Sequence, residues 1–192
     1  MKGGALAFVT MEQTVDGPDS RTHADDLAAF ETIMRQYERL VLVTAYRLLG
    51  NMEDAKDVSQ EAFLRLYRNM GKASAAQNYQ AWLYRVTVNL CHDAGRRRKP
   101  SVAVEDVPEL VSPAAGPQES LAGSERQRIL QMSLRALSPT ERDAVVLRDL
   151  EGLSTEEVAR ALGSSEATVR SQISKGRVKM RNFVERYFRR RV

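Results

Sequence analysis

The sequence has few of the residues that disulfide-bonded, metal-binding and membrane-spanning proteins require. One cysteine, Cys91, in 192 residues excludes an internal disulfide, and only two histidines accompany it. No apolar run reaches the roughly 18 residues that a membrane span needs. These absences predict a cytoplasmic protein with no membrane insertion, no bound metal and no other cofactor.

The motifs of common enzymes are also missing. The chain contains no glycine-rich phosphate loop, no nucleophile elbow and no carboxylates at the spacing of a metal site. His92 follows Cys91 directly, and neighbouring helical side chains point about 100° apart, so these two do not share one metal ion without further ligands. Cys91 is instead expected to be a small buried residue. We therefore expect no enzyme and no catalytic residues.

Apolar residues recur every three or four positions along most of the chain, and no strand-like alternation competes with this spacing. The spacing predicts long helices over residues 27–48, 53–69 and 81–97. The fold is therefore expected to be all-α. The residues expected on the buried face of the third helix are Trp82, Val86 and Leu90.

Prolines and charge divide the chain into parts. Four of the six prolines fall within residues 100–117, and residues 100–123 contain four acidic and no basic residues. Such a segment buries little apolar surface and repels itself, so we expect a flexible acidic linker. Two small helical domains remain, over residues 24–99 and 124–192, after a leader at residues 1–23 that is expected to be disordered. The last domain has 15 basic and 9 acidic residues, which favours a polyanionic partner.

The second domain contains strong helix start and stop signals. The stretches SPTE at 138–141 and STEE at 154–157 have the spacing of capping boxes. Gly163 suits the left-handed position after a helix, and Ser165 suits the N-cap of the next one. Two helices joined by a short glycine-containing turn, the second of them basic, predict a helix-turn-helix.

The helix that follows Ser165 is expected to bind DNA. Nine basic residues and a single acidic one occur between Arg170 and Arg191. A solvated basic face would explain the charge alone, but the capping boxes and the turn glycine favour DNA binding. With Val169 and Ile173 facing inward, the side chains that suit base edges and phosphates are Thr168, Arg170, Ser171, Gln172, Ser174, Lys175 and Arg177.

A helix-turn-helix alone leaves two classes of protein open, because response-regulator output domains and region 4 of sigma factors share the pattern. Residues 24–99 lack the strand pattern of a receiver domain and contain NMEDAKDVSQEAFLRLYRN (51–69) and AWLYRVTVNLCHDAGRRRK (81–99). Both stretches resemble region 2 of the extracytoplasmic-function (ECF, group IV) sigma factors of the sigma-70 family. The alternative is a helix-turn-helix transcriptional regulator that does not replace a sigma factor.

The resemblance implies a sigma factor that binds core RNA polymerase, through the β′ clamp helices and the β flap, and directs it to promoter DNA. Region 4 would read the minus-35 element, and region 2 would capture the melted minus-10 element. An anti-sigma factor is a further expected partner. Lys56 and Ser59 depart from the family pattern. The positions that match the family's polymerase-docking helix are Asp54, Asp57, Gln60, Glu61 and Leu64.

The resemblance also implies a site for the non-template strand of the minus-10 element. Unstacked bases are held by aromatic and polar side chains beside a basic track. Trp82 lies in line with Val86, so core packing is its expected main role, whereas Asn89 occupies a position of polar promoter contact in the family. The matching residues are Tyr79, Trp82, Tyr84, Arg85, Asn89, Arg96, Arg97 and Arg98.

Overall fold

The computed structural model describes residues 18–70, 78–97 and 117–190, and it gives the side-chain surroundings from residue 26 and from residue 123 onward in the first and last stretches. Every regular element in these stretches is a helix, which confirms the all-α prediction. The elements are α1 (Pro18–Leu49), α2 (Met52–Met70), α3 (Tyr79–Arg97), α4 (Pro117–Arg135), α5 (Pro139–Val145), the π-helix η1 (Val146–Leu150), α6 (Thr155–Leu162) and α7 (Glu166–Arg189).

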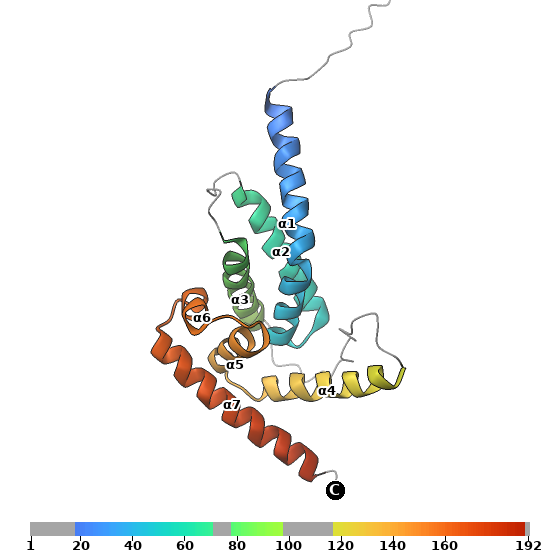
Figure 1. The fold of residues 1–192 in the computed structure, drawn as a ribbon, viewed down its shortest axis with the longest axis vertical. Helices are drawn as coiled ribbons and strands as arrows, with labels where there is room; N and C mark the ends of the chain where they lie inside the picture. The colour runs from blue at the N-terminus through green and yellow to red at the C-terminus, as the bar shows by residue number, and fades with distance from the viewer. Residues whose placement is uncertain (1–17, 71–77, 98–116, 191–192) are drawn as a thin grey trace, which may run out of the picture.

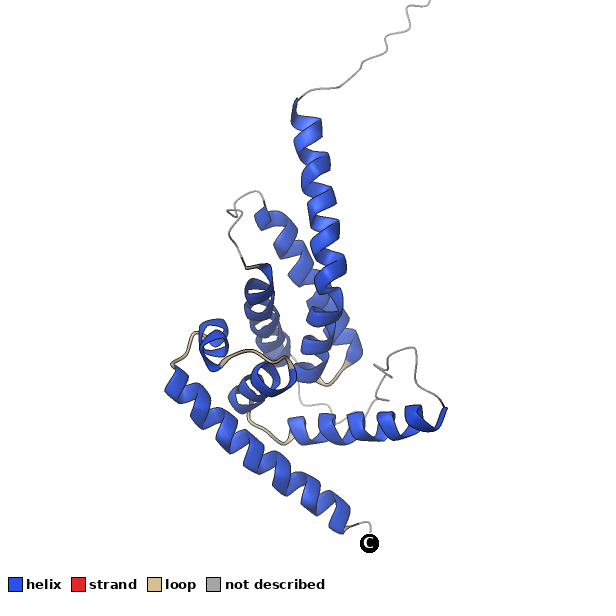
Figure 2. Cartoon of the chain, viewed as in Figure 1, coloured by secondary structure: helices blue, strands red, loops and turns tan. Residues whose placement is uncertain are grey.

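The helices form two lobes that pack against each other (Figures 1 and 2). Helices α1 to α3 form the N-terminal lobe, where α2 and α3 lie along the C-terminal half of α1. Elements α4 to α7 form the C-terminal lobe, where α7 packs against α4, α5 and α6. The lobes meet where α3 contacts α6, and where α1 contacts η1 and α4.

Two helices are longer than the sequence pattern predicts. Helix α1 begins at Pro18, inside the segment expected to be a disordered leader, and α4 begins at Pro117, inside the expected linker. The extension of α1 precedes Leu27, the first residue of the recurring apolar spacing, so that spacing gave no signal for it. The rest of the expected leader, residues 1–17, and most of the expected linker lie outside the described residues.

Local capping determines where the short helices of the C-terminal lobe begin and end. The capping boxes at Ser138 and Ser154 both form, with reciprocal hydrogen bonds between each serine and the glutamate three residues later. Gly163 has φ 60°, which a side chain rarely adopts, and Ser165 caps α7. These contacts confirm the predicted helix-turn-helix boundaries. The π-helical turn η1, in contrast, has no counterpart in the prediction.

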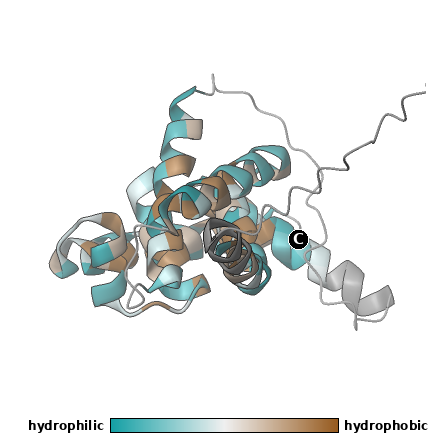
Figure 3. Cartoon of the chain, turned by 90° about the horizontal axis from the view of Figure 1, so that it is seen from above, coloured by the Kyte–Doolittle hydropathy of each residue, from teal (hydrophilic) through white to brown (hydrophobic). Residues whose placement is uncertain are grey.

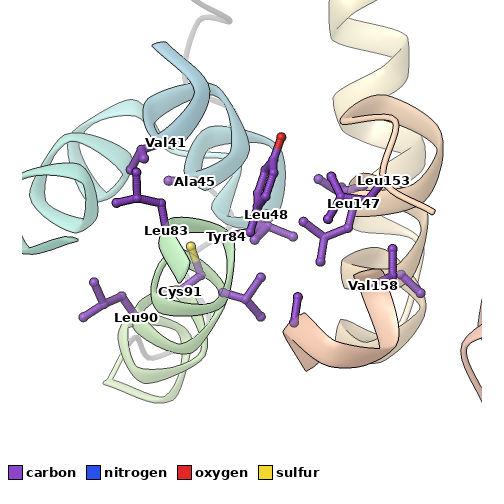
Figure 4. Close-up of a cluster of buried hydrophobic side chains, with 14 of the residues drawn as sticks. Val41, Ala45, Leu48, Leu83, Tyr84, Leu90, Cys91, Leu147, Leu153 and Val158 are labelled. Carbon is purple, nitrogen blue, oxygen red and sulfur yellow. The ribbon is translucent and has the colours of Figure 1, made fainter. Parts of the chain in front are cut away.

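One hydrophobic cluster runs through both lobes. In Figure 4, Leu48 and Tyr84 of the N-terminal lobe face Leu147 and Val158 of the C-terminal lobe. Figure 3 shows apolar residues on the inner sides of the helices, where the helices meet. The expected two separate domains therefore share a continuous core in this structure.

The buried face of α3 differs from the predicted one. Trp82 and Val86 are half-buried at the edge of the core, and only Leu90 of the three predicted residues is fully buried. The face is wider than predicted because α3 packs on two sides, against α1 and α2 and against α6. Cys91 is buried, as predicted. The fully buried residues of α3 are Leu83, Tyr84, Thr87, Val88, Leu90 and Cys91.

Candidate nucleic-acid interface

Helix α7 presents a polar and basic face to solvent. Val169, Ile173 and Gly176 are buried against the rest of the C-terminal lobe, so the opposite face of α7 is turned to solvent. Gln172 is half-buried at the edge of this face. The exposed members of the predicted DNA-binding set are Thr168, Arg170, Ser171, Ser174, Lys175 and Arg177.

Two arginines of this set form ion pairs, one with a carboxylate of α7 and one with a carboxylate of η1. Arg170 pairs with Glu166 one turn earlier. Arg177 donates through Nε and Nη2 to the two carboxylate oxygens of Asp149 on η1, at 2.9 and 2.6 Å. This bidentate bond raises the pKa of Arg177 and leaves its Nη1 end free of the carboxylate. Asp149 is a residue that the sequence pattern missed, because 28 residues separate it from Arg177.

The position of α7 is fixed by close packing against α5. A Cβ at Gly176 would lie 2.6 Å from Cγ2 of Val145, so the two helices approach each other through this glycine. Lys179 donates to both oxygens of Glu141 at 2.8 Å. The bonds from Lys179 and the Ser138 backbone lower the pKa of Glu141 to about 2, so this bond persists across the neutral range.

Helix α3 brings together only part of the predicted minus-10 set. Arg85 and Asn89 are exposed, and Tyr79 and Trp82 are half-buried. Tyr84 is 2% exposed, so it is not accessible to DNA in this conformation and its contact with the minus-10 strand stays a prediction. The C-terminal lobe covers Tyr84, a contact that local periodicity does not encode.

The basic cluster at the end of α3 is partly neutralised within the helix. Arg96 pairs with the carboxylate of Asp93, and Arg97 donates to the Asp93 backbone oxygen at 3.3 Å. Both arginines remain exposed. Arg98, the third predicted phosphate contact, lies outside the described residues.

The predicted polymerase-docking residues form one outer face of α2 that borders two hollows. Gln60 and Leu64 line an apolar groove between α1 and α2, together with Phe30, Met34, Leu42 and Phe63. Asp54, Asp57 and Glu61 line the adjoining hollow between α2 and α3.

An exposed apolar side chain lies at the C-terminal end of this residue set. Leu64 is 49% exposed and adds apolar area beside the groove between α1 and α2. Glu61 accepts a hydrogen bond from Arg65 at 2.8 Å, and this bond lowers the pKa of Glu61. The face therefore offers an acidic and apolar surface to a basic, amphipathic partner.

Metal-binding and membrane-spanning features are absent from the part of the chain that the structure describes. No group of three or more potential ligands converges there. None of the helices in these stretches has the length and apolarity needed to cross a bilayer.

Comparison with known proteins assigns the two lobes. The model for sigma-70 region 2 matches residues 33–100, and the model for sigma-70 region 4 matches residues 127–180. The ECF RNA polymerase sigma-E factor of Escherichia coli K12 is 31% identical over 182 residues, which cover 88% of this chain and 94% of that protein. The chain belongs to the ECF sigma factors of the sigma-70 family.

A second relative and a solved structure agree with this assignment. The ECF sigma factor SigE of Mycolicibacterium smegmatis is 37% identical over 169 residues, which cover 84% of this chain and 63% of that protein. RpoE of Bartonella quintana, solved with the anti-sigma factor NepR, has the same fold at a TM-score of 0.65 and 18% identity, covering 82% of this chain and 97% of that one. The chain is thus a promoter-directing sigma factor rather than a regulator that leaves the polymerase's sigma factor in place.

Proposed function

We propose that α7 enters the major groove of the minus-35 element and that α3 captures the melted minus-10 strand. The observation that carries this assignment is the exposed face of α7, whose inner side packs against α5 at Gly176, where a Cβ would collide with Val145. A recognition helix must be fixed by its own lobe before its outer side chains select bases. Lys175 and Ser174 are exposed on that outer face, where each supplies a donor to base edges or phosphates.

The proposed strand-capturing surface of region 2 is the exposed side of α3. Asn89 provides donors and acceptors for the edge of an unstacked base, and Arg85 lies one helical turn before it. Tyr79 and Trp82 are half-buried, and their accessible portions offer stacking area. Arg96 and Arg97 are proposed to contact the backbone of the same strand.

We further propose that the outer face of α2 docks on the β′ clamp helices of the polymerase and that α7's lobe contacts the β flap. The acidic side chains Asp54, Asp57 and Glu61 favour a basic partner, and Leu64 supplies exposed apolar area. This sigma factor is proposed to act in the cytoplasm and to supply no catalytic group, so the chemistry belongs to the polymerase.

An anti-sigma factor is the proposed negative regulator. RpoE of Bartonella quintana was solved with NepR. The apolar groove between α1 and α2 adjoins the proposed polymerase surface, so a protein seated there would compete directly with the polymerase.

Run-off transcription tests the proposal. Core RNA polymerase is incubated with genomic promoter fragments, with and without the purified chain. Specific transcripts that require the added chain are expected, and their start sites identify both promoter elements. Binding of the chain to DNA without any specific initiation would contradict the proposal.

A further inference from the structure

The C-terminal end of α1 is a docking site for the other lobe. Carbonyl groups in the last turn of a helix lack partners within the helix and form the negative end of its dipole. Three side chains of the C-terminal lobe donate to backbone oxygens there. Arg142 Nη1 donates to Leu48 O at 2.9 Å, and Arg135 Nη2 donates to Gly50 O at 2.6 Å. Gln131 Nε2 donates to the backbone oxygen of Tyr46 at 3.1 Å. The C-terminal lobe therefore completes the capping of α1.

Gly50 allows this close approach. Its φ of 69° lies in the left-handed region, and a Cβ there would lie 2.8 Å from Nε of Arg135. The contact between the lobes is thus specified by backbone geometry as well as by charge.

A buried ion pair lies beside this docking site. Arg47 Nη1 donates to Glu151 Oε1 at 2.8 Å, and the Glu151 side chain is 9% exposed. The other oxygen, Glu151 Oε2, accepts a hydrogen bond from the hydroxyl of Tyr84 at 3.3 Å. Through these bonds Glu151, the residue that follows η1, joins Arg47 of α1 to Tyr84 of α3.

A third contact joins the lobes through a titratable pair. Nε2 of His92 on α3 lies 2.7 Å from Oδ2 of Asp143 on α5. Asp143 is 4% exposed, whereas the His92 side chain is 41% exposed. The carboxylate is therefore shielded from water, while the imidazole stays open to protons.

Charged neighbours surround this pair on both helices. Arg96 and Asp93 act on His92 from α3 with opposite signs. Arg142, next to Asp143 on α5, is oriented toward carbonyl groups of Leu134, Leu137 and Leu48.

We propose that this conformation is a closed state of the sigma factor and that the pair between His92 and Asp143 is its proton-dependent latch. The latch is strong when His92 is protonated and weak when His92 is neutral. Opening separates α3 from α6 and from Glu151 and exposes Tyr84. That opening makes α3 available to the melted promoter strand rests on the proposed function of α3. The proton-dependent latch does not depend on that function.

The direction of the pH dependence follows from linkage. The hydrogen bond to Asp143 raises the pKa of His92 above its ordinary value near 6.5, and burial opposes this change. Closure is thus favoured fully below the ordinary pKa and loses this contribution as the pH rises through the raised one. Each unit of difference in the pKa of His92 between the closed and open states changes the closing equilibrium by about tenfold.

Energy transfer between dyes on the two lobes tests the latch without polymerase or DNA. Dyes are attached to Arg35→Cys on α1 and Arg181→Cys on α7, both exposed sites. Cys91 stays native, since it is buried and burial raises the pKa of its thiol, which slows labelling. The closed fraction is expected to fall as the pH rises from the ordinary pKa of histidine, near 6.5, through the raised pKa of His92. The fall is expected to be absent in His92→Gln, which retains a hydrogen bond but not the charge.

A direct titration provides the second measurement. The imidazole of His92 is followed by NMR in the full chain, with His23 as the second histidine signal. The pKa of His92 is expected to drop toward its ordinary value in Asp143→Asn. Any of three results would overturn the proposal. The closed fraction of the native chain does not change with pH, the His92→Gln variant shows the same pH profile as the native chain, or the pKa of His92 is unchanged in Asp143→Asn.

Discussion

The two helices proposed to contact promoter DNA differ in how much of their surface is available. Helix α7 is anchored on one side and presents Ser171, Ser174 and Lys175 to solvent on the other. Helix α3 is packed on two sides, and its buried Tyr84 bonds to Glu151 of the opposite lobe. The proposed minus-35 surface is therefore accessible in this conformation, whereas the proposed minus-10 surface is only partly accessible.

This difference has a physical origin in the two helices' partners. Helix α7 is held by contacts within its own lobe, including Lys179 with Glu141 and Gly176 with Val145. The covering of α3 depends on groups that are 51 to 67 residues away in sequence and belong to the other lobe. If the lobes open as proposed above, access to α3 changes while the contacts that hold α7 remain.

The largest effect is expected for substitutions on the exposed face of α7, which are expected to weaken DNA binding. Replacement of both Arg170 and Lys175 by alanine removes two proposed DNA contacts, and each good base contact contributes about 1–3 kcal/mol of discrimination. The double variant is expected to lose about 2–6 kcal/mol of affinity for minus-35 duplex, measured by fluorescence anisotropy. The control is the double variant Arg35→Ala with Arg39→Ala, because it removes the same number of positive charges from the exposed surface of α1. Equal losses in both variants would indicate attraction by net charge alone.

A smaller effect is expected for the contacts between the lobes that bury Tyr84 of α3. Glu151→Gln removes the carboxylate charge from the buried pair with Arg47, which is expected to weaken closure by about 1–3 kcal/mol. The readout is the closed fraction measured by energy transfer between α1 and α7. The matched control is Glu156→Gln on α6, whose ion pair with Arg160 at 3.8 Å is exposed. No difference between these two variants would show that Glu151 does not hold the lobes together.

Polymerase binding is expected to be less sensitive to a single residue, because α2 presents a broad face. Charge reversal at Asp57 places a cation in the acidic hollow between α2 and α3 and is expected to weaken binding of core polymerase by about tenfold. Binding is measured by competition against labelled native chain. Glu31→Arg on α1 makes the same change of charge at an exposed site. Unchanged competition by the Asp57 variant would remove α2 from the proposed interface.

The smallest effect concerns the anchoring of α7. Gly176→Ala is expected to destabilise the chain by about 1 kcal/mol, because overpacking against Val145 outweighs the helix propensity of alanine. Gly95→Ala has no neighbour within 4 Å of the new Cβ, so it is expected to be neutral or stabilising. Urea unfolding measures both variants. A Gly176 variant at least as stable as the Gly95 variant would contradict the close approach.

The sequence predicts the C-terminal lobe well because its signals are local. The capping boxes at Ser138 and Ser154 and the left-handed Gly163 depend on residues three or four positions apart, and all of them form. The burial of Val169 and Ile173 follows from helical spacing in the same way. These contacts determine which face of α7 is free.

The burial of α3 by the C-terminal lobe is not predictable from such spacing. Tyr84 lies on a helix whose pattern allows either exposure or burial, and its burial depends on Glu151, 67 residues later. The pair between His92 and Asp143 is likewise a contact between the lobes. Periodicity describes one buried face for each helix, whereas α3 has two, so the second needs the arrangement of the lobes.

The most direct test compares the two DNA surfaces in the free chain. Once run-off start sites identify the promoter elements, the native chain and Glu151→Gln are each titrated with labelled minus-35 duplex and with the minus-10 non-template strand. The native chain is expected to bind the duplex and to bind the single strand much more weakly, and the variant is expected to gain single-strand affinity without any change toward the duplex. Tight binding of the single strand by the native chain, equal to that of Glu151→Gln, would contradict a covered α3.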